Sequence, residues 1–146
     1  MIDKQWIGHE LAATTMTLER GRLCAFARAI GETDPVYTDL AAAKDAGYAD
    51  LPVPPSFLFG AELDAGTLDR MLADLDIPIA RILHGEQSFT YHKAVCAGET
   101  VTVKSRIADI FDKKNGALEF LVKTSEARND NHELVAELRT VLVVRN

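Results

Sequence analysis

The chain has 146 residues, of which 47% are hydrophobic and 26% are charged, and its formal net charge is −6. This length suits a single domain over residues 1–146 that can bury a sizeable core. The acidic balance argues against a general nucleic-acid-binding protein, which would carry a basic patch, and no apolar run is long enough to span a membrane.

The remaining bulk features point to an intracellular protein without metals. The first ten residues are polar and lack the apolar segment of a secretion signal. Cys24 and Cys96 each stand alone in apolar surroundings, which is typical of reduced thiols in a cytoplasmic protein. No Cys or His spacing suggests a metal site, and we expect no cofactor.

The N-terminal part predicts a short strand followed by a helix. The segment QWIGHELAATTMTL begins with an apolar stretch and ends in Thr-rich sequence. Residues 19–30 then place Leu23, Phe26, Ala27 and Ile30 at the spacing i, i+3, i+4, i+7, which indicates an amphipathic helix. Thr17 suits its N-cap and Gly31 its end.

Residues 31–50, GETDPVYTDLAAAKDAGYAD, follow as an acidic, proline-marked stretch. Such a stretch is usually a surface loop. Its residues Glu32, Asp34 and Tyr37 are nevertheless candidates for a site, because a cleft-lining loop would have the same composition.

A second, longer helix is predicted over residues 54–75, where apolar residues follow a 3-4-3-4-3 spacing from Leu58 to Leu75. Pro55 or Ser56 can open this helix, since proline suits the first helical turn and serine suits the cap.

After Pro78 the apolar period changes to two, which predicts four strands around residues 87–91, 101–107, 118–122 and 136–144. Asn115-Gly116 is a strong hairpin signal. The four strands can form an antiparallel meander beside the long helix. This is an α+β, hot-dog-like arrangement with an antiparallel sheet wrapped around a long central helix, although other α+β rolls fit the pattern.

Three segments in order, FARAIGETDPVYTDLAAAKDAGY, VPPSF and HGEQSFTYHKAVCAGETV, resemble the MaoC-type hot-dog dehydratases and hydratases. The likeness is to the subgroup found as an N-terminal or partner half. It implies a protein that acts on, or holds, 2-enoyl or 3-hydroxyacyl thioesters of coenzyme A or acyl-carrier protein. It also implies a homodimer or a heterodimer with another hot-dog chain, and sheet edges favour pairing in any case.

In active members the loop after the first helix reads roughly Gly-Asp-x-Asn-Pro-Leu-His, and its Asp and His activate water. Here Glu32 stands at the Asp position and Tyr37 at the His position. A phenol with a reference pKa of about 10 is a poor base near neutral pH. The resemblance therefore implies that the usual dyad is not intact.

Further candidate residues follow from the same resemblance. His84 could replace the missing base if a bulge at Gly85 turned its side chain toward the cleft. Ser56 and Phe57 could donate backbone N–H groups to the thioester oxygen.

Gln87 could hydrogen-bond the ligand or simply sit in the sheet. Asp34 could bind substrate or hold the loop through its backbone.

Three functions stay open from the sequence. The chain could be a catalytic hydratase or dehydratase. It could be a non-catalytic subunit that completes the acyl tunnel of a dyad-bearing partner. It could also be a hot-dog thioesterase that uses the Glu32 or Asp34 carboxylate.

Overall fold

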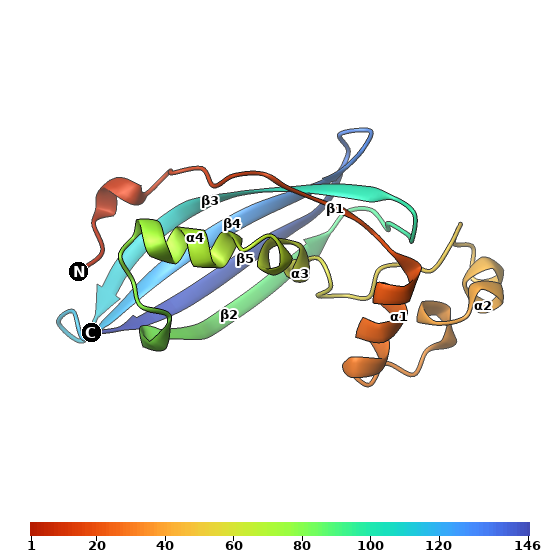
Figure 1. Ribbon diagram of the computed structural model, residues 1–146, viewed down its shortest axis with the longest axis horizontal. Coiled ribbons are helices and arrows are strands. Elements are labelled where there is room, and N and C mark those ends of the chain that lie inside the picture. Colours follow the sequence, from red (N-terminus) through yellow and green to blue (C-terminus); the bar gives the residue numbers. More distant parts are fainter.

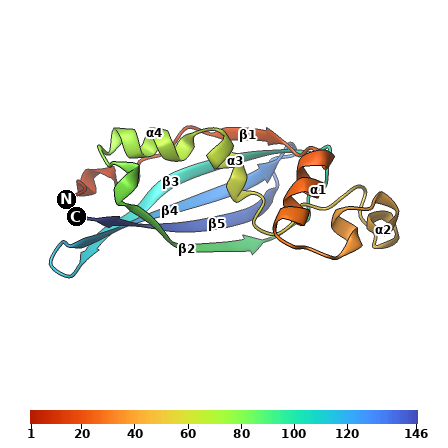
Figure 2. The same cartoon turned by 60° about the horizontal axis from the view of Figure 1, so that its bottom comes forward.

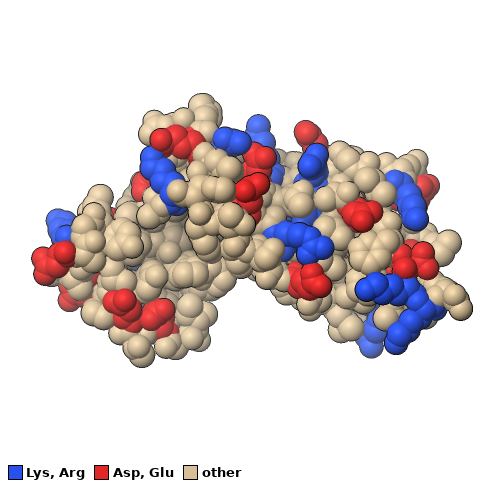
Figure 3. Space-filling view, turned by 180° about the vertical axis from the view of Figure 1, so that it is seen from behind, with Lys and Arg blue, Asp and Glu red and all other residues tan.

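The computed structural model describes residues 1–146 as an α+β fold in which a curved antiparallel sheet carries helices on one face (Figure 1). The five strands are β1 (Thr14–Thr17), β2 (Ile82–Tyr91), β3 (Thr100–Lys113), β4 (Leu118–Asn129) and β5 (Leu134–Arg145). The sheet's other face has no helix over it and carries acidic and basic side chains together (Figure 3). The interior therefore lies on the helix side.

The strand order is β1-β3-β4-β5-β2. Strands β3, β4 and β5 form the expected meander, with positive φ angles at Asn115 and Gly116 in the first turn. The prediction of a four-strand meander is wrong for β2, which pairs with β5 at the far edge of the sheet. The connection from β2 to β3 is not a hairpin, because Val95 and Ala97 bond instead to the backbone of residues 51–53.

Seven helical segments complete the fold. The α-helices are α1 (Arg20–Ala29), α2 (Leu40–Asp45), α3 (Phe59–Asp64) and α4 (Thr67–Asp74), and the 3-10 helices are η1 (Lys4–Trp6), η2 (Pro35–Tyr37) and η3 (Ile79–Arg81). α1 matches its prediction, with Gly31 in the left-handed conformation after its end, but Glu19 rather than Thr17 occupies the N-cap position. α2 was not predicted, because it lies within the acidic stretch that the sequence indicated as a loop. The Asp39 carboxylate caps its N-terminus.

The predicted single helix over residues 54–75 is two helices, α3 and α4, which follow one another above the sheet (Figure 2). Gly66 interrupts the helix with a φ of +66°, a left-handed value that glycine adopts without strain. The helix also begins at Phe59 rather than at Pro55 or Ser56, because Ser56 has a φ of +73°.

Candidate functional site

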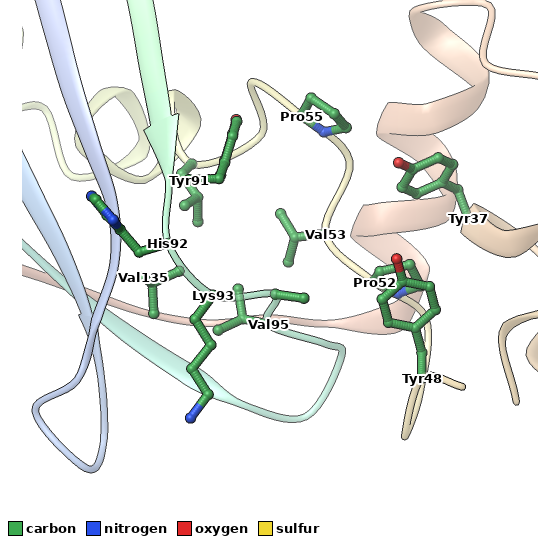
Figure 4. A pocket seen from close by; sticks show the side chains of 12 residues that line it. Tyr37, Tyr48, Pro52, Val53, Pro55, Tyr91, His92, Lys93, Val95 and Val135 are labelled. Carbon is green, nitrogen blue, oxygen red and sulfur yellow. The ribbon is translucent and has the colours of Figure 1, made fainter. Parts of the chain in front are cut away.

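A cavity of about 330 Å³ lies where the α1–α2 region faces the loop before α3 and the end of β2 (Figure 4). Most of its lining is apolar and includes Val53, Leu58, Val95 and Val135. This volume falls within the usual range for small-molecule sites.

All three tyrosines of the chain line this cavity. Tyr37 comes from η2, Tyr48 follows α2, and Tyr91 ends β2 on the wall opposite Tyr37 (Figure 4). Burial raises the pKa of Tyr37 above its usual value, and the nearby Glu32 carboxylate raises it further. Burial also raises the pKa of Tyr91. Both hydroxyls are therefore neutral hydrogen-bonding groups near pH 7.

Tyr91 is tied to the turn that precedes α3. The backbone N–H of Ser56 donates to Tyr91 Oη at 2.9 Å. The N–H of Phe57 donates to the Pro54 carbonyl oxygen at 3.1 Å. The two backbone donors that the sequence suggested for a thioester oxygen are thus already engaged in this structure. The Phe57 side chain is buried and packs edge-to-face on Phe26.

The acidic residues of the loop hold its backbone. Glu32 Oε1 accepts hydrogen bonds from the N–H groups of Thr33 and Asp34 at 2.8 and 2.9 Å. Asp34 Oδ1 accepts from the Val36 N–H at 3.0 Å and caps η2, as an Asp before Pro often does. Of Glu32, Asp34 and Tyr37, only Tyr37 lines the cavity.

His84 and Gln87 lie elsewhere on β2 and do not line the cavity. The strand shifts register between His84 and Glu86, so the bulge at Gly85 on which a role for His84 depended is present, but it does not bring His84 to the cavity. A Cβ at Gly85 would stand 2.9 Å from a Val143 methyl carbon, which explains the glycine. The His84 ring stacks on Phe59, with 5.3 Å between ring centroids.

The Gln87 side chain is held by the neighbouring strand. Its Oε1 accepts a hydrogen bond from Thr140 Oγ1 of β5 at 2.7 Å. This contact fits the simpler of the two roles that the sequence left open, a place in the sheet.

Four lining residues with polar side chains were not among the predicted site residues: Tyr48, Tyr91, His92 and Lys93. The His92 ring turns toward β5, away from Tyr37 (Figure 4), and its Nε2 lies 2.8 Å from Glu137 Oε2. Lys93 forms an ion pair with Glu133. The one available signal was that Tyr91 ends an alternating strand.

No group of three or more His, Cys, Asp or Glu side chains is arranged to hold a metal ion. No helix is both long and apolar enough to cross a membrane. Cys24 and Cys96 are both free.

A family model and curated relatives both match this chain. The sequence model described as "FAS1-like, dehydratase domain region" matches residues 5–138. A UPF0336 protein of Parafrankia sp. is 42% identical over 129 residues, covering 86% of this chain and 82% of the relative.

Solved structures agree on the fold. One chain of the HadBC (3R-hydroxyacyl-ACP dehydratase) complex from Mycobacterium tuberculosis has a TM-score of 0.74 at 27% identity, covering 88% of this chain and 89% of that one. A MaoC-like dehydratase has a TM-score of 0.83 at 22% identity, covering 97% of this chain but only 42% of its own length. The hot-dog fold expected from the sequence is confirmed.

Proposed function

Because this chain belongs to the FAS1-like dehydratase family and is of the acyl-thioester hydratase/dehydratase type, we propose that it holds acyl thioesters for a second hot-dog chain that supplies the acid and base. The acyl group would occupy the 330 Å³ cavity. The thioester would be linked to coenzyme A or to acyl-carrier protein.

The observation that carries this proposal is the lack of a base directed into the cavity. Adding water to a 2-enoyl thioester needs a positioned base, which typically contributes about 10²–10⁴-fold in rate. The Glu32 carboxylate is turned to its own loop, and the His92 ring is turned away. The hydroxyls of Tyr37 and Tyr91 are protonated.

What remains is a site suited to binding. The apolar walls suit an acyl chain, and protonated phenols donate hydrogen bonds to a carbonyl oxygen. Tyr91 is the better placed of the two phenols, because the Ser56 N–H already donates to its oxygen and leaves its own proton free. A hydroxyl that accepts one hydrogen bond donates the next one more strongly.

The second chain would pair along β2. This strand is the sheet edge beyond β5, is ten residues long, and is mostly exposed. Leu83 and Tyr91 on it are 48% and 46% exposed. A long edge with exposed apolar side chains favours pairing with another sheet. The HadBC structure is a complex of chains. The MaoC-like dehydratase chain is more than twice as long as the part of it that this domain matches.

The roles expected for the remaining site residues fit this arrangement as proposals. His84 and Gln87 lie on the edge strand and would reach a site shared with the second chain. Glu32 and Asp34 would position the loop that presents Tyr37. The free cysteines support the expectation of a cytoplasmic protein.

Calorimetric titration and a hydration assay with crotonyl-CoA test the proposal. The isolated chain should bind crotonyl-CoA and hydrate it far below about 10 s⁻¹, the median turnover of enzymes. Adding a hot-dog chain with an intact Asp-x-Asn-Pro-x-His loop should restore turnover. Turnover near 10 s⁻¹ by the isolated chain would refute the holding role, and failure to bind both acyl-CoA and acyl-carrier-protein thioesters would refute the ligand.

A further inference from the structure

A layer of buried polar side chains crosses the interior between α3 and the sheet. Glu62 of α3 and Lys123 of β4 form an ion pair with 2.5 Å between Oε2 and Nζ, and their side chains are only 4% and 6% exposed. Ser105 donates to the other Glu62 oxygen, and Ser125 lies 3.3 Å from Oε2. We call these four residues the polar layer.

The polar layer divides the core in two. Along the inner face of β4, Leu121 belongs to one apolar cluster and Ala127 to the other, with Lys123 and Ser125 between them. The cluster that contains Ala127 also contains Leu58, and the cluster that contains Leu121 also contains Met71 and Leu142. An otherwise continuous apolar interior is thus interrupted by charge.

Stability alone is a weak reason for such a pair. Taking two charges out of water costs free energy that their attraction only partly returns, and apolar residues of similar volume often do as well or better. A charged pair in this place is therefore expected to serve specificity.

The pair lies about one helical turn from a residue that lines the candidate site. Leu58 lines the 330 Å³ cavity, and Glu62 follows it by four residues, which places the two on one helix face about 6 Å apart along the axis. Beside the pair remains only a narrow space of about 20 Å³, bordered by Glu62, Lys123 and Met71 among others. That space has room for about one water molecule.

We propose that the Glu62–Lys123 pair forms the closed end of the acyl site, so that this chain accepts short acyl groups and excludes long unbranched ones. This proposal rests on the proposed holding function. A methylene chain extended along α3 would meet the carboxylate and ammonium groups and would have to separate or desolvate them, without offering a hydrogen bond in return.

Titrating the full chain with saturated acyl-CoA thioesters of four to twelve carbons tests this inference. Each buried CH₂ should improve the dissociation constant about fourfold, from about 0.8 kcal/mol per group. In the native chain this gain should stop once the acyl group reaches the pair. In the double variant E62L/K123M the gain should continue for several more carbons.

A matched control removes an exposed pair from the same strand. Arg128 and Glu126 lie 2.7 Å apart on β4 with both side chains largely exposed, so E126L/R128M should keep the native chain-length profile. The native chain alone also tests the inference. If its dissociation constant improves about fourfold with each added carbon up to twelve carbons, the inference is overturned. Parallel profiles in the native chain and a folded E62L/K123M would overturn it as well. Absence of binding at every length, with acyl-CoA and acyl-carrier-protein thioesters alike, would instead overturn the holding function itself.

Discussion

At the scale of single residues, Glu32 and Tyr37 decide whether the cavity can activate water. Restoring the hydratase pattern with E32D/Y37H should place a near-neutral base where only a phenol now stands, and Tyr37 already lines the cavity. We expect crotonyl-CoA hydration by the isolated chain to rise about 10²-fold, the lower end for one positioned base.

The matched control for this change is Y48H. Tyr48 lines the same cavity, but the residue five positions before it is Ala43, whereas Glu32 stands five positions before Tyr37. It should give no comparable gain. An equal rise from Y48H would show that any histidine in the cavity suffices, and no rise from E32D/Y37H would remove the loop from the reacting site.

The buried pair gives a prediction on stability. In K123M, Glu62 keeps a buried carboxylate without its cation, which we expect to lower the free energy of unfolding by about 3–5 kcal/mol. E62L/K123M should instead match the native chain or exceed it. Urea denaturation of both variants measures this. A K123M chain as stable as the native one would mean that water reaches the pair.

The same lysine predicts a pH dependence. Burial lowers the pKa of Lys123 below its usual 10.5, although the Glu62 carboxylate opposes this shift. Between the lowered pKa and about 10.5 the unfolded chain binds more protons than the folded one, so the free energy of unfolding should rise with pH across that window. This slope should vanish in E62L/K123M. The difference between the two proteins isolates Lys123, because both keep every tyrosine.

At the scale of elements, the sequence predicted the strands well and the helix breaks poorly. Alternation identified β2 to β5, since a sheet with one covered face selects for a period of two. It could not reveal the inner face of β4, because that face carries Lys123 and Ser125 while Phe120 and Val122 point outward. Likewise, the apolar spacing from Leu58 to Leu75 continues across Gly66 without interruption, so it gave no sign that the helix breaks there.

The candidate site was predictable only in part, for a related reason. The loop pattern identified Tyr37. Tyr91 is instead held in place by a hydrogen bond from the Ser56 N–H, and no apolar pattern predicts the positive φ of Ser56. The crossing of residues 92–99, which brings His92 and Lys93 to the cavity, depends on backbone bonds to residues 51–53. Such long-range contacts leave no local periodicity.

The helix break itself is testable. G66A forces a Cβ-bearing residue to a φ of +66° and should destabilise the fold by about 1 kcal/mol. Gly60 inside α3 is the control, since its φ is not left-handed and a Cβ there meets no atom within 4 Å. G60A should be neutral or stabilising by up to about 1 kcal/mol. Thermal denaturation compares the two, and equal effects would argue against a required left-handed residue.

At the scale of the whole molecule, the exposed β2 edge predicts an assembly of at least two chains, either two copies or this chain with another hot-dog chain. In β2 the backbone groups on one side bond to β5, and those on the other side have no strand beside them. If β2 pairs with a second sheet, hydrogen exchange should show slow exchange at successive amides throughout residues 82–91, rather than at alternate ones. Light scattering at micromolar concentration should then give the mass of two chains, alone or after addition of a dyad-bearing chain. A monomer under both conditions, with every second β2 amide exchanging rapidly, would show that the edge is free and would contradict the proposed two-chain assembly.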